Sequence, residues 1–272
     1  MWADVSWVRA GLLPADGASW EAVTTGESGA VVLHDRGRGR FAKLVPVADR
    51  GDLAAERDRI AWLGQKGVPT ASVLDWRTTD DGACLITDAV RGVPADQLDA
   101  AALRHAWPAI AATVRDLHAL PAADCPFGGG LASMMPLART TVAEHRVQTE
   151  FLPMAMQQVP PAQILGRLED DLPQRRRQEE SEHVVCHGDL CLPNILIDPD
   201  TMRVTGLIDL GRLGVADPYA DIALLLATAR ETWPDEPTAR RADDEFAALY
   251  GADLDAERQH FYLLLDPLTW PA

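Results

Sequence analysis

Cysteine is scarce in this sequence, and long apolar runs are absent from it. Four cysteines in 272 residues are too few for a disulfide scaffold, so we expect reduced thiols in a cytoplasmic protein. Cys186 and Cys191 flank His187 without the C-x-x-C spacing of zinc ligands, which favours ordinary thiols over a structural metal. No apolar run approaches the roughly 20 residues that cross a bilayer. The first residues also lack the basic and apolar regions of a secretory signal.

The sequence also has few basic residues relative to acidic ones. The chain has 25 lysines and arginines against 41 aspartates and glutamates, which gives a formal net charge of −16. A surface of this charge repels phosphate backbones and anionic membranes. The composition therefore argues against nucleic acid and membranes as partners. It is compatible with a cationic small molecule, although acidity of this kind mainly reports solubility.

The first third of the chain has the pattern of a small sheet. Short β-rich runs lie between Trp20 and Asp88, separated by Gly, Asp and Pro turn signals. One helical segment interrupts them. We expect residues 1–91 to form a β-rich lobe. The runs are VVLHD, FAKLV, SVLDW and CLIT.

Residues 92–272 have a mainly helical pattern. Strands return at VVC, ILI and VTGLID, and helices resume after Pro218. Because the chain exceeds the usual size of one core, we expect two lobes. The predicted fold class is α+β and bilobal, with a small β-rich N-terminal lobe and a larger, mainly helical C-terminal lobe. The clearest apolar stripe, at steps of four and three, is Leu103, Trp107, Ile110, Val114 and Leu117.

Polar residues with catalytic potential follow the late strands. Asp189 and Asn194 lie in HGDLCLPN with four residues between them, and Asp209 comes after a strand, a DPDT turn and a second strand. Phosphoryl transfer needs a carboxylate to orient the attacking hydroxyl and oxygen ligands for a divalent metal. The spacing matches the kinase H-R-D-x-x-x-x-N loop and the later DFG aspartate. Either aspartate alone would indicate a turn cap, but the hairpin between them brings both loops together.

A buried ion pair is predicted in the first lobe. Lys43 lies in FAKLV, on the strand face that also carries Phe41 and Val45. In the next helix, Glu56 shares the apolar stripe of Leu53, Ile60 and Leu63. An unpaired carboxylate there is costly, so a Lys43–Glu56 pair that points the ammonium at nucleotide phosphates is expected. The alternative is two exposed, unrelated charges.

A glycine-containing turn, TGESG, precedes the Lys43 strand. Its glycines allow a tight turn, and Ser28 offers a hydroxyl and backbone N–H groups to a phosphate. The turn matches neither a P-loop nor a complete G-x-G-x-x-G, so an ordinary hairpin turn stays an open alternative.

Taken in order, these motifs resemble the aminoglycoside phosphotransferases over nearly the whole chain. Within that family they look most like the aminoglycoside 3''-phosphotransferases, which phosphorylate streptomycin. The resemblance implies a fold like that of eukaryotic-type protein kinases, with ATP and Mg²⁺ as cofactors. It also implies streptomycin as the acceptor, at its 3''-hydroxyl, and antibiotic resistance as the outcome. The segments are GESGA, FAKLVP, ERDRIAWL, GACLIT, VVCHGDLCLPN, TGLIDLGRLGVADPYADIAL and FYLLLDPLTW.

The resemblance also implies roles for the residues already named. Asp189 corresponds to the catalytic base or hydroxyl-orienting group. Asn194 and Asp209 correspond to the ligands of the magnesium ions that bridge the ATP phosphates. Lys43 would contact the α and β phosphates, and Glu56 would hold Lys43 in place.

Further roles follow from the same resemblance. Backbone groups of Asp88 and Val90, in the hinge, would pair with adenine. His187 and Asp221 would support the catalytic loop, and Arg212 would tie down the metal loop. Ordinary loop packing is the alternative for each supporting residue.

The chain departs from protein kinases at two places. Gly188 stands where they carry an arginine, and no APE-like segment follows Asp209. We therefore expect neither a protein substrate nor regulation by activation-loop phosphorylation.

Candidates for the acceptor site follow from the family's acidic pocket. Glu231 and Asp266 are the positions in register, since carboxylates can hold a guanidinium in bidentate pairs. Trp270 closes this pocket or packs the terminus, and packing is favoured. The other acids of this region are expected on a solvated face: Asp235, Glu236, Asp243, Asp244 and Glu245.

Two alternative functions stay open. Within the same class, the acceptor could be another aminoglycoside, choline or an amino sugar. In a different class, the chain could be a nucleotide-binding pseudokinase scaffold, although a scaffold has no evident need for the complete set of Lys43, Glu56, Asp189, Asn194 and Asp209.

Overall fold

The structure is a computed structural model that describes residues 11–23 and 30–270. The chain forms two compact units. The first unit contains Met1–Gly92 together with Thr205–Gly211, and the second contains Val93–Val204 together with Arg212–Ala272. The functional assignment of residues 1–91 to nucleotide binding and of residues 92–272 to catalysis stays a prediction.

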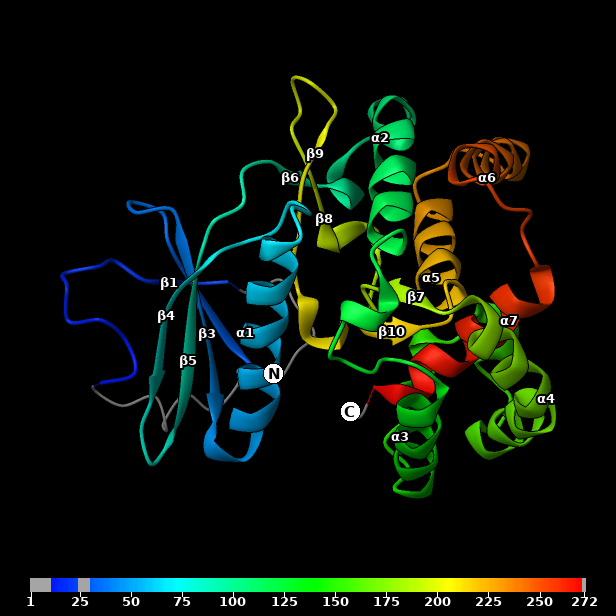
Figure 1. The fold of residues 1–272 in the computed structure, drawn as a ribbon, viewed down its shortest axis with the longest axis horizontal. Coiled ribbons are helices and arrows are strands. Elements are labelled where there is room, and N and C mark those ends of the chain that lie inside the picture. The colour runs from blue at the N-terminus through cyan, green and yellow to red at the C-terminus, as the bar shows by residue number, and fades with distance from the viewer. Residues whose placement is uncertain (1–10, 24–29, 271–272) are drawn as a thin grey trace. The chain divides into compact units, whose positions relative to one another are not determined.

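The first unit is built on an antiparallel sheet of five strands, in the order β1-β2-β3-β5-β4 (Figure 1). The predicted β-rich runs lie in these strands, except for Ser72, which precedes β4. In the register of the sheet, Lys43 of β3 lies between Val32 of β2 and Leu85 of β5. The strands are β1 (Glu21–Ala22), β2 (Val31–Asp35), β3 (Arg40–Pro46), β4 (Val73–Thr78) and β5 (Gly82–Asp88).

One helix, α1 (Arg50–Gln65), packs against β3, β4 and β5. It buries four residues with helical spacing, and these are the residues of the predicted stripe, Glu56 included. Glu56 is the polar residue of this stripe, and a buried carboxylate needs a partner. Because successive residues of a strand face opposite sides of the sheet, the strand cluster that contains Ala42 and Leu44 lies on the face opposite Lys43 and includes no residue of α1. The helix buries Leu53, Glu56, Ile60 and Leu63, and the sheet buries Ala42, Leu44, Cys84 and Ile86 beside Leu12.

A later segment of the chain also belongs to the first unit. This segment includes the end of strand β9 (Val204–Leu207). The Leu207 N–H donates to the Pro69 carbonyl of the first unit at 2.9 Å. The Thr70 hydroxyl donates to the Leu207 carbonyl at 2.8 Å. These bonds fix the end of β9, and the chain then continues directly into Asp209.

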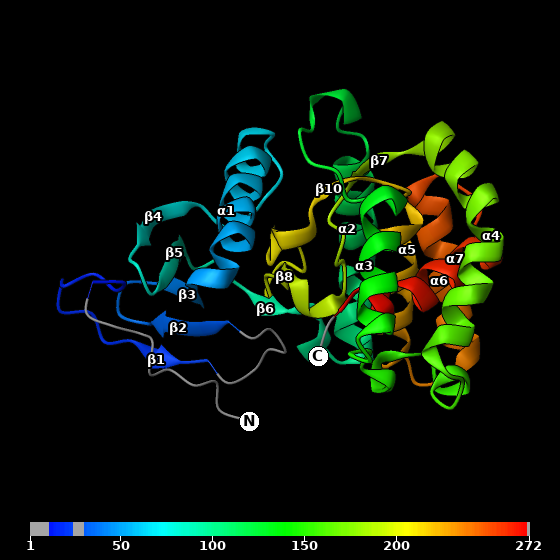
Figure 2. The same cartoon turned by 90° about the horizontal axis from the view of Figure 1, so that it is seen from below.

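The second unit is mainly helical, as the sequence predicts (Figure 2). Strands β7 and β10 pair antiparallel, with Cys186 opposite Gly214, and β6 pairs with β8. The helices are α2 (Ala100–His118), α3 (Leu131–Ala143), α4 (Pro161–Glu182), α5 (Tyr219–Arg230), α6 (Glu236–Tyr250) and α7 (Ala256–Leu265). The strands are β6 (Val93–Pro94), β7 (Val184–Cys186), β8 (Ile195–Ile197) and β10 (Gly214–Ala216).

Helix α2 shows why this unit forms. Asp99 caps its first turn, with its Oδ1 accepting the Ala102 N–H at 2.8 Å. The predicted apolar stripe is buried along its whole length. Trp107 is 1% exposed, and its indole N–H donates to the Ala242 carbonyl at 2.9 Å, which joins α2 to α6. Burial of a tryptophan with its polar atom satisfied favours a fixed packing of these two helices.

Two sequence-based predictions, on membrane-spanning segments and on disulfides, can be compared with the structure. Among the described helices, none has the length and apolar character needed to span a membrane. None of the four cysteines forms a disulfide; Cys84 and Cys186 are buried, and Cys125 and Cys191 are half-buried.

Candidate active site

Lys43 and Glu56 form the ion pair that the sequence predicts. The Lys43 ammonium donates to Glu56 Oε2 at 2.8 Å and to Asp209 Oδ1 at 3.0 Å. The Glu56 side chain is 10% exposed and that of Lys43 is 21% exposed, whereas Asp209 is 44% exposed. A cation from β3 is thus held between a buried carboxylate from α1 and a more accessible one after β9.

The carboxylates of Glu56 and Asp209 stabilise the charged form of Lys43. Burial opposes the charge of Lys43, but the neighbouring carboxylates of Glu56 and Asp209 raise its pKa above the ordinary value for lysine. Burial raises the pKa of Glu56, and the cation beside it opposes that rise. Lys43 therefore stays protonated at neutral pH, and phosphate oxygens would meet a permanent cation here.

Asp209 has an unusual backbone conformation. Its φ is +61°, which places a residue other than glycine in the left-handed region. Aspartate is one of the residue types that enter this region at moderate cost. The conformation turns the chain directly after β9 and leaves the carboxylate beside Lys43.

In the second unit, Asn194 holds Asp189. The Asn194 amide nitrogen donates to the Asp189 carbonyl oxygen at 2.9 Å and to its carboxylate Oδ2 at 3.0 Å. Asn194 ends a 3₁₀ turn, Leu192–Asn194, and is buried, while Asp189 is half-buried. The spacing of five residues thus brings the two side chains together through one tight turn.

The turn at Gly188 requires glycine. Its φ is +83°, and a Cβ atom there would lie 2.4 Å from the carbonyl oxygen of Arg212. No side chain fits at that distance, which gives a physical reason for glycine at the position where protein kinases carry arginine.

The predicted supports of the catalytic loop contact it directly. Asp221, at the start of α5, accepts the backbone N–H of His187 at 2.7 Å and that of Gly188 at 2.8 Å. The Asp189 N–H donates to Nδ1 of His187 at 3.2 Å. Asp221 and His187 are both completely buried. Two successive amides on one carboxylate fix the path of the chain into Asp189.

The donor atoms on the two predicted metal ligands fit magnesium. Mg²⁺ prefers hard oxygen ligands. Because the Asn194 amide nitrogen is engaged with Asp189, its oxygen is the atom offered to a cation. Asp209 offers a partly exposed carboxylate. The chemistry of both side chains is therefore compatible with the predicted role.

The predicted nucleotide contacts lie at two places. Ser28 lies outside the described residues. The Asp88 N–H donates to the Ser72 carbonyl at 3.1 Å, so this end of β5 is tied to the chain before β4. Val90 lies against Gly206, where an added Cβ would come within 2.7 Å of its Cγ1. The adenine contacts of Asp88 and Val90 stay predictions.

The two acceptor candidates have different surroundings. Glu231 is exposed and directly follows α5. Asp266 accepts from Arg212 Nη1 at 3.1 Å, while Arg212 Nη2 donates to the Thr269 carbonyl at 2.9 Å. The Arg212 guanidinium also lies 3.6 Å from the centre of the Trp270 ring. Burial raises the pKa of Asp266 and Arg212 opposes the rise. Arg212 thus ties the segment before β10 to the C-terminal turn, and the substrate roles of both acids stay predictions.

Three of the other acids of this region have structural partners in hydrogen bonds or ion pairs. Asp235 caps α6 by accepting the Thr238 N–H at 2.8 Å. Glu236 and Asp243 both contact Arg230. These contacts favour the interpretation of the acidic stretch as a surface network.

Sequence reasoning missed two residues behind the catalytic loop. His118 contacts Asp221, and Tyr250 contacts His118. A signal for His118 was present, because it lies four residues after Val114 and so continues the buried stripe of α2. Tyr250 had the same kind of signal, because it lies four residues after Phe246 on the buried face of α6.

These parts define a class of protein. A sheet lysine paired with a helix glutamate, an aspartate after a later hairpin, and a loop with aspartate and asparagine five residues apart are the components of kinase-type phosphoryl transfer. The sequence model described as "Phosphotransferase enzyme family" matches residues 19–260. The chain belongs to this family.

Individual relatives make the similarity more specific. Streptomycin 3''-kinase of Streptomyces griseus is 58% identical over 254 residues, which cover 93% of each chain. An aminoglycoside 3'-phosphotransferase of Streptomyces fradiae is 40% identical, over 91% of this chain and 94% of that one. The solved structure of aminoglycoside phosphotransferase APH(3'')-Id from Streptomyces rimosus, in complex with ADP and streptomycin, superposes with a TM-score of 0.91. It is 52% identical and covers 95% of this chain and 96% of that one. The predicted kinase-like α+β fold is confirmed by this similarity.

Proposed function

We propose that this protein transfers the γ-phosphate of ATP to the 3''-hydroxyl of streptomycin and thereby confers resistance. The observation that carries the proposal is the 58% identity to a streptomycin 3''-kinase over 93% of both chains. A relative at 52% identity that binds ADP and streptomycin supports it. Since ATP is a cytoplasmic metabolite, we place the reaction in the cytoplasm.

The nucleotide is assigned to the charged group of the first unit. Lys43 contacts the α and β phosphates, and Glu56 keeps its ammonium in place through the 2.8 Å contact. Asp209 and Asn194 bind Mg²⁺, which supplies neutralisation of the phosphate charge. Backbone groups of Asp88 and Val90 hold adenine, and Ser28 contacts the phosphates.

The hydroxyl is assigned to Asp189. Its carboxylate accepts the proton of the attacking 3''-hydroxyl and aligns the oxygen for in-line displacement. Asn194 restricts that carboxylate through the 3.0 Å bond to Oδ2. Glu231 and Asp266 bind guanidinium groups of the acceptor. Positioning and charge neutralisation then supply most of the acceleration.

Phosphorus NMR of the product tests acceptor and position together. After incubation with ATP, Mg²⁺ and streptomycin, a new phosphomonoester signal coupled to the proton at the 3'' carbon is expected. A phosphomonoester at a different carbon would reject the 3'' assignment. Absence of any phosphorylated streptomycin would reject the acceptor.

A panel of acceptors separates the alternative functions. ADP release is measured with streptomycin, kanamycin and choline at equal concentration. Streptomycin should give the highest kcat/KM. A higher value with kanamycin or choline would identify a different kinase, and ATP binding without ADP release on any acceptor would support the pseudokinase scaffold.

The small number of lysines offers an independent test of the nucleotide site. Lys43 and Lys66 are the two lysines of the chain. An acyl-phosphate derivative of ATP, which acylates lysines near bound phosphates, should label Lys43, and excess ATP should prevent this labelling. Lys66 serves as the internal control, since its labelling should be insensitive to ATP. Equal labelling of Lys43 with and without ATP would contradict the assignment.

A further inference from the structure

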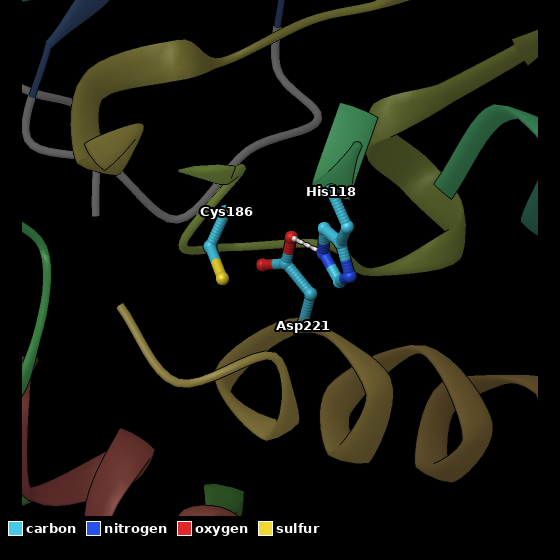
Figure 3. A group of neighbouring side chains, drawn as sticks. All are labelled: His118, Cys186 and Asp221. Carbon is cyan, nitrogen blue, oxygen red and sulfur yellow. Dashed lines mark hydrogen bonds and ion pairs between the residues drawn. The ribbon is translucent and has the colours of Figure 1, made fainter. Parts of the chain in front are cut away.

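Behind the catalytic loop, three side chains with metal-binding capacity lie together. His118 of α2, Cys186 of β7 and Asp221 of α5 place one ligand atom each within 4.8 Å of the others, and all three are buried (Figure 3). Among the described residues, this is the one group of at least three such side chains whose ligand atoms lie close enough to hold a metal ion. Its position makes the choice between a metal site and a hydrogen-bonded network important.

The contacts of the three side chains favour a network. The Cys186 thiol donates to the Asp217 carbonyl at 3.3 Å, and burial raises its pKa well above the ordinary value. A protonated thiol is a poor metal ligand. Both oxygens of Asp221 already accept backbone N–H groups. His118 has a hydrogen-bond partner at each ring nitrogen.

The bonds of His118 define a directed chain of donors. Its Nε2 lies 3.1 Å from Asp221 Oδ2, and its Nδ1 lies 2.8 Å from the Tyr250 hydroxyl oxygen. Asp221 Oδ2 already accepts the His187 amide and acts as an acceptor toward His118 as well, so Nε2 carries the proton. In the neutral ring, Nδ1 then accepts the Tyr250 O–H. The chain runs from Tyr250 through His118 to Asp221, which also accepts the amides of His187 and Gly188.

We propose that His118 and Tyr250 are positioning residues for phosphoryl transfer, acting through Asp221 on the catalytic loop. The proposal rests on the assignment of Asp189 as the hydroxyl-orienting group. His118 comes from α2 and Tyr250 from the end of α6, and so two helices outside the loop set the orientation of the carboxylate that holds it.

The location of the network explains why such an anchor has an effect. Asp221 and His118 are 0% and 7% exposed, so water does not replace a lost donor easily. Without the His118 donor, only the amides of His187 and Gly188 hold the carboxylate, and its orientation is less restricted. Gly188 and Asp189 follow directly in the chain, and a small displacement of the attacking group reduces turnover strongly.

Two conservative substitutions separate the two bonds of His118. In His118→Gln the side-chain amide nitrogen occupies the place of Nε2 and can still donate to Asp221. In His118→Asn the amide reaches only the place of Nδ1, toward Tyr250. We expect kcat to fall about 10- to 100-fold in His118→Asn and to stay within about threefold of the unchanged protein in His118→Gln.

The KM for ATP should change little in both variants, because the nucleotide residues of the first unit are untouched. Tyr250→Phe, which keeps the ring and loses the hydroxyl, should give an intermediate loss of kcat. His105→Gln is the matched control, since His105 is exposed on the same helix. Equal kcat values for the Gln and Asn variants of His118 would overturn the proposal. Losses of kcat that are fully explained by lower melting temperatures of the variants would also overturn it.

Amide hydrogen exchange gives a reading that does not depend on the acceptor. In His118→Asn, the amides of His187 and Gly188 should exchange at least about tenfold faster, and in His118→Gln they should exchange at nearly the original rate. Faster exchange with no activity of the unchanged protein on streptomycin would reject the acceptor but keep the anchor. Unchanged exchange at both amides in the Asn variant would reject the anchor itself.

Discussion

Of the two carboxylates that contact the ammonium of Lys43, Glu56 is the buried one. The pair is close, at 2.8 Å, and Glu56 is buried while its second neighbour Asp209 is much more exposed. A charge-assisted bond of this kind contributes about 1.5–3 kcal/mol. Without Glu56, Lys43 would lose its buried partner and keep only the more exposed contact with Asp209.

Replacing Glu56 by glutamine tests this arrangement. Glu56→Gln keeps the shape and loses the charge, so kcat/KM for ATP should fall about 10- to 100-fold. Steady-state kinetics with ATP as the varied substrate measure the effect. Glu169→Gln is the control, because Glu169 makes an exposed pair with Arg139. A kcat/KM for ATP equal to that of the control would show that Lys43 needs no partner.

Asp189 should affect chemistry without affecting nucleotide binding. In Asp189→Ala, kcat should fall by at least about 10²-fold, since the group that receives the hydroxyl proton is lost. Calorimetry should show an ATP affinity within about threefold of the original value. Asp200→Ala, at an exposed turn, is the comparison. A large loss of ATP affinity with preserved turnover at saturation would place Asp189 in the nucleotide site instead.

At the scale of elements, the turn between β7 and the 3₁₀ segment Leu192–Asn194 is tightly constrained at Gly188. Gly188 and Gly251 share a positive φ, at +83° and +93°. They differ in their surroundings, because a Cβ at Gly188 would meet the Arg212 backbone and a Cβ at Gly251 would meet nothing within 4 Å. A comparison of substitutions at these two glycines therefore separates the effect of backbone strain from the effect of steric overlap.

Alanine at these two positions should have unequal effects. Gly251→Ala adds only the strain of a left-handed residue, about 1–2 kcal/mol. Gly188→Ala adds a displacement of the loop to that strain, so we expect a greater loss of stability and also a loss of kcat of at least about tenfold. Urea unfolding and steady-state kinetics of both variants measure this. Similar kcat values in the two variants would mean that the loop can shift without harm.

For the whole molecule, the dominant property is its net charge of −16. A cationic acceptor is attracted to such a surface, and salt screens the attraction over about 10 Å at 0.1 M ionic strength. Raising the salt concentration should therefore lower kcat/KM for streptomycin several-fold while kcat stays nearly constant. The same salt series with ATP as the varied substrate should not show a parallel fall, because ATP is an anion. A parallel fall for both substrates would indicate a general salt effect on the enzyme.

Features that depend on local geometry could be predicted from the sequence alone. The strand alternation around Lys43 and the helical spacing of Leu53, Glu56 and Ile60 predicted an ion pair, because both periodicities fix the face on which a side chain lies. The four residues between Asp189 and Asn194 are a distance that one tight turn can close. The fold class followed from the change of pattern after Gly92.

Contacts between residues far apart in the chain could not be predicted in this way. Asp221 contacts His118 across 103 positions of the chain, and Arg212 contacts Asp266 across 54. The sequence placed Asp266 at the acceptor and Arg212 at the metal loop, with no indication that the two residues pair with each other. Such contacts depend on how helices pack, and many sequence patterns with the same periodicity would allow other pairs. Burial then determines which of these polar groups must bond, because an unsatisfied buried carboxylate or imidazole has no water to replace its partner.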